Sequence, residues 1–310
     1  MGAQLRVGTF TRSLLIQVAT VTGALDRAGI EVEETLVASS PAQFKSLAAG
    51  EFDLVMTSPD NALAYRFLSQ NPLGQNIPVR ILAAIDRGLG LSLCLAPRLE
   101  NVESVRGQIV GVDVPQSGFA FVAYALLEKS GLLPDDYDVQ ALGSTPRRTD
   151  ALIAGDCAAT VLNAGNELRA IGAGCVVVSQ VTKLGPYLGT VLAAIPSQDQ
   201  REEANRLRFA DVLLETSQQI HSGQWEREVI EEAMALLGLT QGQALSHHAI
   251  LRNPQQGLVP SGVVDRASIS TLIDLRSKYL PSVELDTILD SLGTLVIDRA
   301  LEKPAGSTDA

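Results

Sequence analysis

Five short segments of this sequence carry side chains that could hold a small polar molecule. They are residues 9–13, 57–61, 113–119, 143–148 and 163–166. Each follows a short apolar run typical of a β-strand, and most of them open a run with helical spacing. Ligands bind beyond the carboxyl ends of parallel strands, so we expect the five segments to meet at one site.

The hydroxyl, amide and cationic side chains of these segments favour an anionic ligand. Helix amino ends offer free N–H groups and a partial positive charge, and a guanidinium group can pair with a carboxylate or a sulfonate. The residues that we expect to contact the ligand are Phe10, Thr11, Arg12, Ser58, Asp60, Asn61, Asp113, Ser117, Gly118, Phe119, Thr145, Arg148, Asn163, Asn166 and Tyr187.

Many of these residues also have a purely structural explanation. The serines and the threonines suit helix capping, and the aromatic residues could fill the core as well as stack on a flat ligand. The carboxylates of Asp60, Asp86 and Asp113 could act as acid and base or hold an ammonium group. Helix capping and hydrogen bonds at a hinge explain these carboxylates better.

Groups for covalent or metal chemistry are scarce. The sequence has no Gly-x-Ser-x-Gly turn and no cysteine close to a histidine, and we expect no histidine in the cleft. His221, His247 and His248 show no zinc-ligand spacing, so the sequence predicts neither a metal ion nor a cofactor.

The three cysteines, Cys94, Cys157 and Cys175, form no Cys-x-x-Cys pair. We interpret them as small apolar residues that fill the core, because free cysteine usually behaves in this way. A disulfide between Cys157 and Cys175 is the alternative.

An internal repeat predicts the architecture. Residues 40–58 and 145–163 each begin with a hydroxyl residue suited to cap a helix, and proline follows at the first helical position. Each predicted helix ends at a glycine, Gly50 or Gly155, and a short apolar strand follows. A strand, a helix and a second strand precede both copies. Each half is therefore predicted to be a β-α-β-α-β unit with a largely parallel sheet and helices on both faces.

Two extended runs predict crossings between these units. The first lies around residues 86–90, between apolar runs at 79–85 and 91–95, and the second covers residues 187–195. We predict that lobe 1 comprises residues 1–88 and 190–310, and that lobe 2 comprises residues 89–189. Beyond residue 197 the apolar spacing predicts helices over 226–237, 266–278 and 285–301.

Three motifs resemble those of a known family. They are Leu47-Ala-Ala-Gly-Glu-Phe-Asp-Leu-Val-Met-Thr-Ser58, Arg148-Thr-Asp-Ala-Leu-Ile-Ala-Gly155 and Gly257-Leu-Val-Pro-Ser-Gly-Val-Val-Asp265. Along nearly the whole chain, the sequence resembles the nitrate, sulfonate, taurine and thiamine-precursor binding proteins of ABC importers. The resemblance implies a type II periplasmic-binding-protein fold, an ABC transporter permease as partner, and Arg148 facing the cleft. Ala158 departs from the family, which usually has an aspartate there.

Two functional classes are compatible with these patterns. The first is a substrate-binding protein that closes by a hinge motion around a small polar or anionic ligand. The second is a cytoplasmic enzyme on the same fold, of the lyase or decarboxylase type, which would use Asp60 or Asp113. The absence of an evident nucleophile favours the binding protein.

Length and charge limit the partners. The chain has 310 residues, enough for two α/β lobes, and a formal net charge of -11. This acidity disfavours nucleic acid and anionic lipid, and no apolar stretch is long enough to cross a membrane. We expect a monomer. The printed sequence does not begin with a signal peptide, so we expect a periplasmic or extracellular location if a targeting segment was removed, and a cytoplasmic one if Met1 is the natural start.

Overall fold

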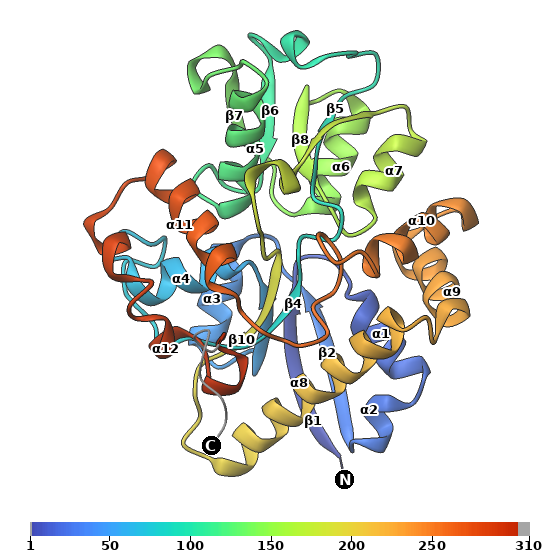
Figure 1. Ribbon diagram of the computed structural model, residues 1–310, viewed down its shortest axis with the longest axis vertical. Helices are drawn as coiled ribbons and strands as arrows, with labels where there is room; N and C mark the ends of the chain where they lie inside the picture. The colour runs from blue at the N-terminus through green and yellow to red at the C-terminus, as the bar shows by residue number, and fades with distance from the viewer. Residues whose placement is uncertain (1, 303–310) are drawn as a thin grey trace.

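The protein has two α/β lobes, each built around a five-stranded sheet, in a computed structural model that describes residues 2–302 (Figure 1). The first sheet has the order β2-β1-β3-β10-β4, formed by β1 (Ala3–Thr9), β2 (Ile30–Leu36), β3 (Leu54–Thr57), β4 (Arg80–Asp86) and β10 (Thr190–Ala194). The second has the order β7-β6-β8-β5-β9, formed by β5 (Ser92–Leu95), β6 (Ile109–Val112), β7 (Asp138–Ala141), β8 (Ala159–Leu162) and β9 (Val176–Gln180).

The two sheets share one topology. In each sheet the strand that arrives from the other lobe is antiparallel to both of its neighbours, namely β10 in the first sheet and β5 in the second. The pairs of β1 with β2 and β3, and of β6 with β7 and β8, are parallel. The predicted two-lobed α/β fold with two crossings is therefore confirmed. The residue boundaries of the lobes stay a prediction.

The helices alternate with the strands, as short apolar runs separated by capped helical segments require. They are α1 (Leu14–Val21), α2 (Ala24–Arg27), α3 (Ser40–Ala48), α4 (Pro59–Phe67), α5 (Gly118–Lys129), α6 (Thr145–Ala154), α7 (Asn166–Gly172), α8 (Gln200–His221), α9 (Glu226–Leu237), α10 (Gln241–Leu251), α11 (Arg266–Tyr279) and α12 (Leu292–Leu295). Among these residues, no helix is long and apolar enough to span a membrane.

The repeat is visible in the structure with a small shift at its helix starts. Ser39 and Ser144 occupy the N-cap positions of α3 and α6, one residue before the predicted caps, so proline is the second helical residue in each. Gly155 ends α6 in the left-handed region with φ 84°, as expected for a helix C-cap. The strands that follow, β3 and β8, are buried along their whole length, as central strands covered by helices on both faces are.

The segment predicted as a helix over residues 285–301 is instead broken into three pieces. A 3₁₀ turn at Val283–Thr287, the short α12 and a 3₁₀ turn at Asp298–Ala300 replace it. Between the last two, Val296 is extended and pairs with Ile81 of β4. The apolar spacing that suggested a helix reflects packing of this segment against the first lobe. The sequence analysis also did not identify α8 and α10.

Two C-terminal helices flank the junction of the lobes, α11 on one side and α10 on the other (Figure 1). Arg276 of α11 forms a buried, two-point ion pair with Asp60 of α4, at 2.7 and 2.6 Å, and donates to the Gln116 carbonyl of the second lobe at 3.3 Å. Its guanidinium also lies over the ring of Phe121 in α5, 5.0 Å from the centroid. A single side chain of α11 thus contacts both lobes.

We predict that Arg276→Met destabilises the protein by about 3–5 kcal/mol, because it leaves the Asp60 carboxylate buried without its partner. Urea unfolding measures the change. Arg227→Met is the control, since Arg227 forms an ion pair with Glu228 while 77% of its side chain is exposed, and it should not change the stability. An Arg276→Met variant as stable as the wild type would show that the ion pair does not hold the junction together.

Candidate functional site

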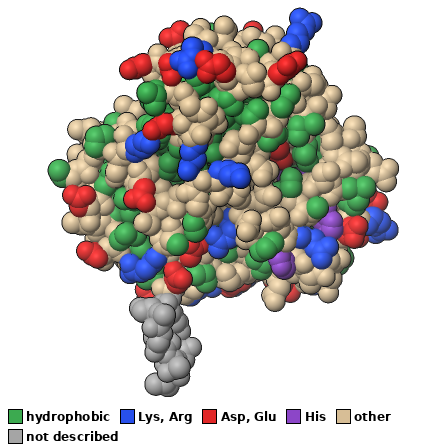
Figure 2. Space-filling model, turned by 45° about the horizontal axis from the view of Figure 1, so that its top comes forward, with side chains coloured by type: hydrophobic (Ala, Val, Ile, Leu, Met, Phe, Trp, Pro, Cys, Tyr) green, Lys and Arg blue, Asp and Glu red, His purple; other side chains and the backbone are tan. Residues whose placement is uncertain are grey.

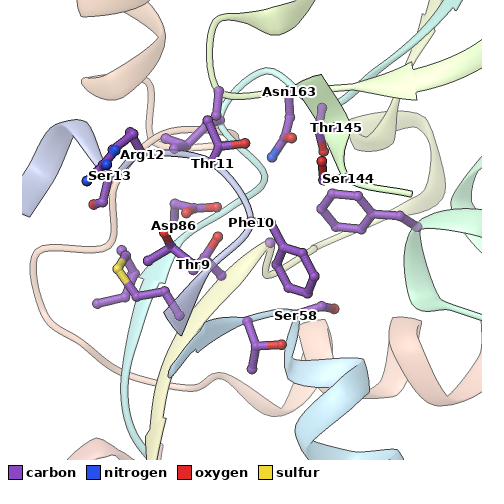
Figure 3. A pocket seen from close by; sticks show the side chains of 18 of the residues that line it. Thr9, Phe10, Thr11, Arg12, Ser13, Ser58, Asp86, Ser144, Thr145 and Asn163 are labelled. Carbon is purple, nitrogen blue, oxygen red and sulfur yellow. The ribbon is translucent and has the colours of Figure 1, made fainter. Parts of the chain in front are cut away.

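A cavity of about 130 Å³ lies between the lobes and is lined by residues from all five predicted segments. The predicted residues on its wall are Phe10, Thr11, Arg12, Ser58, Asn61, Asp113, Ser117, Gly118, Phe119, Thr145, Arg148 and Asn163. In Figure 3 the ring of Phe10 lies between Ser58, below it, and the pair Ser144 and Thr145, above it. Asp86 and Thr9 lie to the left of the ring. The carboxyl ends of strands from both sheets therefore meet at this cavity.

Three predicted residues lie behind the cavity wall. Asp60 faces Arg276, because α4 and α11 pack together at this point. Tyr187 is buried in the apolar core that spans both lobes. Asn166 donates to the Asn163 carbonyl at 3.0 Å and so braces the segment that reaches the cavity. Asn163 directly follows β8 and lines the cavity, whereas Asn166 is the first residue of α7 and is buried behind the cavity wall.

Arg148 is the buried cation of the site, with 1% of its surface exposed. Its Nε donates to Thr160 Oγ1 at 3.2 Å and its Nη1 to the Gly143 carbonyl at 2.6 Å. Its Nη2 donates to Thr145 Oγ1 at 3.1 Å and to the Val161 carbonyl at 3.2 Å. All four acceptors are neutral. One of the five guanidinium N–H groups, on Nη1, is left over.

Backbone amides in the first turns of two helices add to this positive site. Ser117 caps α5 by accepting from the Ala120 amide at 3.1 Å, which leaves the amides of Gly118 and Phe119 without an acceptor in residues 2–302. At the start of α6, the amide of the first helical residue, Thr145, is also without an acceptor within that range. These residues line the cavity, so their free N–H groups lie where an anion would bind.

The carboxyl groups of Asp113 and Asp86, on the cavity wall, oppose the positive charge of Arg148. Burial raises the pKa of Asp113, although the nearby Arg148 guanidinium and a hydrogen bond donated by the Ser117 hydroxyl oppose the effect. Burial raises the pKa of Asp86 to about 6, against hydrogen bonds from Thr190 and from the Gly88 amide at 2.7 Å. Burial therefore disfavours the ionised form of both carboxyl groups.

Arg12 lies at the rim of the cavity, with half of its side chain exposed. Its Nη1 is 3.8 Å from Glu34 Oε2 and donates to the Glu34 carbonyl at 3.4 Å. Glu34 also accepts from the Thr9 hydroxyl and the Ser13 amide, both at 2.8 Å. Glu34 thus partly balances the charge of Arg12. Arg148, whose acceptors are all neutral, attracts an anion more strongly than Arg12 does.

Part of the cavity lining is apolar and comes from the first lobe and from Leu89 in the crossing between the lobes. It is formed by Leu14, Leu15, Met56, Ile85, Leu89, Leu237, Leu251 and Leu258. Except for Leu89 and Leu237, which pack against it, these residues are members of the buried core of α1, α8, α9 and α10. The cavity therefore has a polar wall and an apolar wall.

The expectation of a cleft without histidine is wrong. His247 of α10 lines the cavity, with 1% of its surface exposed, and its Nδ1 is buried without a hydrogen-bond partner. Burial lowers the pKa of His247 to about 4, so the ring is neutral at pH 7. No local sequence pattern marks His247 as a cavity residue, because α10 is positioned by its packing against α9 and α7. Ser13, Ser144 and Thr190 also line the cavity, although they are not among the predicted site residues.

The cysteines, the metal-ligating side chains and the surface charges bear on the remaining expectations. The three cysteines are free and buried, which leaves no Cys157–Cys175 disulfide. In residues 2–302 no group of three or more His, Cys, Asp or Glu side chains could hold a metal ion. Figure 2 shows Lys and Arg side chains interspersed with Asp and Glu on one face, without a broad basic area.

The fold is that of solved periplasmic binding proteins, although no family model and no curated protein matches the chain. The nitrate-binding protein NrtA from Synechocystis PCC 6803 matches with a TM-score of 0.72 and 12% identity, covering 96% of this chain and 86% of that one. The alkanesulfonate-binding protein SsuA from Xanthomonas axonopodis pv. citri, bound to MOPS, matches with a TM-score of 0.69 and 14% identity, covering 97% and 99%. A Candida albicans protein described as having the generic periplasmic binding protein fold matches with a TM-score of 0.70 and 14% identity, covering 99% and 98%. These likenesses confirm the predicted type II periplasmic-binding-protein fold.

We predict that Asp86 makes the stability depend on pH. Its pKa is higher in the folded state, about 6, than its ordinary value of 3.8, so its contribution is complete below pH 3.8 and is lost as the pH rises through 6. The stability of the wild type minus that of Asp86→Asn should fall by about 2 kcal/mol from pH 4 to pH 7 and change little above pH 7.

Urea unfolding at a series of pH values measures this difference. Asp135→Asn, at an exposed position, is the control and should follow the wild-type curve. Parallel curves for the wild type and Asp86→Asn would mean that the Asp86 carboxyl is well solvated.

Proposed function

We propose that this chain, which has the periplasmic-binding-protein fold, is a substrate-binding protein that holds a small anion-bearing molecule between its lobes. One observation carries the proposal. Arg148 is a buried guanidinium on the cavity wall, all its bonded acceptors are neutral, and residues with free amides at the starts of two helices line the same cavity. The partner that would take up the ligand is an ABC transporter permease.

Electrostatics supports an anion over a neutral or cationic ligand. Burying a guanidinium without an ion-pair partner is costly, and a ligand carboxylate or sulfonate would offset that cost. At a separation of about 4 Å and an effective dielectric constant of about 20, two unit charges attract by about 4 kcal/mol. Asp113 and Asp86 are the opposing acidic groups on the cavity wall, and burial, which raises the pKa of each, disfavours their charged forms.

The size of the cavity limits the ligand to a small molecule. An engineered cavity of about 150 Å³ in another protein accommodates benzene, so a cavity of about 130 Å³ admits a molecule of similar size. Phe10 and Phe119 line it and suit a ligand with a flat or apolar part. Peptides and nucleotides would not fit a cavity of this volume.

Contacts at the junction of the two lobes support a binding protein that closes around its ligand. Asn163 of the second lobe donates to the Gly88 carbonyl in the crossing at 3.1 Å. Gly118 at the start of α5 approaches α4 so closely that an added Cβ would lie 2.7 Å from the Cβ of Asp60. The neighbours named as nitrate- and alkanesulfonate-binding proteins take oxyanions, the ligand chemistry that Arg148 suits.

A second candidate function is an enzyme of the lyase or decarboxylase type. Asp113 lines the cavity and burial raises its pKa, which suits a group that exchanges a proton. Asp60, the other carboxylate considered, is engaged by Arg276. Mass spectrometry of a bound ligand after incubation separates the two functions. The binding protein releases its ligand unchanged, whereas turnover that is lost in Asp113→Asn would support the enzyme.

We predict that small carboxylates or sulfonates raise the melting temperature, while sugars and organic cations do not, because a ligand specific for the folded state stabilises it. Arg148→Gln should weaken anion binding by about 2–4 kcal/mol. Arg147→Gln is the matched control, since Arg147 is the preceding residue of α6 and is exposed.

Thermal-shift titration measures the binding, and circular dichroism verifies that each variant is folded. Stabilisation by cations or sugars alone, or equal anion affinity in Arg148→Gln and the wild type, would contradict the proposal.

A further inference from the structure

The side chain of Glu167, the second residue of α7, is buried at the junction of the lobes. Both of its carboxyl oxygens are buried and form no hydrogen bond in residues 2–302. A Cβ added to Gly90, in the crossing, would lie 3.0 Å from Glu167 Oε1 and 3.3 Å from Ile250 Cδ1 of α10. The carboxyl group thus lies where α7 of the second lobe, the crossing and α10 of the first lobe meet.

The face of α10 that packs against α7 carries a second group without a partner, His247 Nδ1. Gln243, His247 and Ile250 lie four and three residues apart, so they share one face of the helix. Gln243 donates to the Leu168 carbonyl of α7 at 2.7 Å, and Ile250 lies beside Gly90 and Glu167. His247 lies between these two contacts along the helix. The contact of α7 with α10 therefore holds a carboxyl group and an imidazole that are not paired.

The charged side chains of the neighbouring elements have partners elsewhere. Arg169 of α7 donates to Asp150 of α6 at 3.0 Å, and Arg148 of α6 donates to neutral groups of its own lobe. Asp86 of β4 accepts from the Gly88 amide at 2.7 Å. Among the described residues, no charged side chain changes the pKa of Glu167.

The remaining titratable neighbours do not supply a charge to Glu167 either. Burial raises the pKa of the thiols of Cys94, in β5, and Cys175, before β9, so both are neutral at pH 7. Burial lowers the pKa of His248 on α10, and Glu226 of α9 and Arg252 of α10 act on that histidine. Glu167 is therefore buried as a neutral acid, because an isolated carboxylate would be costly there.

We propose that the contact of α7 with α10 is pH-dependent, because Glu167 must take up a proton before the two helices can pack together. When the helices separate, water reaches the carboxyl group and it ionises. A rise in pH therefore favours separation of the lobes. This inference concerns the motion of the lobes, goes beyond the proposed function and does not depend on which ligand binds.

The pH range follows from the groups at the junction. Burial raises the pKa of Glu167 from 4.5 to about 8, so its contribution to packing is complete below pH 4.5 and is lost as the pH rises through 8. His247 acts in the opposite direction, since burial lowers its pKa from 6.5 to about 4, and its contribution is lost as the pH falls through 4. Asp86, with a pKa of about 6, also titrates below pH 7. Between pH 7 and pH 9 Glu167 dominates, and the equilibrium constant for packing should fall about tenfold.

Electron paramagnetic resonance measures the separation of the two helices, without ligand, between spin labels on Ala173→Cys, which follows α7, and Ser246→Cys of α10. Both positions are exposed, whereas the three natural cysteines are buried. The population with widely separated labels should grow from pH 7 to pH 9. In Glu167→Gln, whose side chain is neutral and of similar shape, it should not grow. Glu231→Gln, exposed on α9, is the matched control and should behave like the wild type.

Infrared spectroscopy detects the proton itself, whether or not the helices move. The wild-type spectrum minus that of Glu167→Gln should show the band of a protonated carboxyl group at pH 7 and lose it by pH 9. Circular dichroism verifies that each variant is folded. A label separation that does not change with pH, a change that persists in Glu167→Gln, or no protonated carboxyl band at pH 7 would overturn the inference. None of these outcomes bears on anion binding, which the thermal-shift titration tests separately.

Discussion

The site depends on the burial of one guanidinium group, that of Arg148, among neutral acceptors. Those acceptors come from β8, from the segment that precedes α6 and from the first residue of α6. Thr160, one of them, also donates to the Gly111 carbonyl of β6 at 2.6 Å. The guanidinium therefore ties together the strand ends and the helix start that form the polar wall. Because none of these acceptors is charged, its positive charge remains available to the cavity.

The two lobes contribute unlike surfaces to the cavity. The second lobe supplies Arg148 and the open first turns of α5 and α6, whereas the first lobe supplies polar side chains such as Ser58 and Asn61 together with most of the apolar lining. The helices at the junction hold these surfaces face to face. On one side Arg276 joins α4, α11 and the start of α5, and on the other Gln243 of α10 donates to the Leu168 carbonyl of α7 at 2.7 Å. Such a site favours a small molecule with an anionic end and an apolar body.

The features that could be predicted from sequence were those set by local patterns. The repeated cap, helix, glycine and strand determine each half of the fold, and the strand-end rule located most of the polar wall, Arg148 included. The errors came from long-range packing. Asp60 is in a helix start like several of the predicted residues that line the cavity, but its partner Arg276 lies far along the chain. His247 belongs to a helix whose position follows from its packing, and no local pattern marks it as a cavity residue.

A crystal structure of the protein with the anion that raises its melting temperature most tests the central claim directly. The account predicts an anionic oxygen within hydrogen-bond distance of Arg148 Nη1 and of the Gly118 or Phe119 amide, with the rest of the ligand against the leucines of the first lobe. An anion bound elsewhere, or a cavity ligand that turns a neutral part toward Arg148, would contradict it.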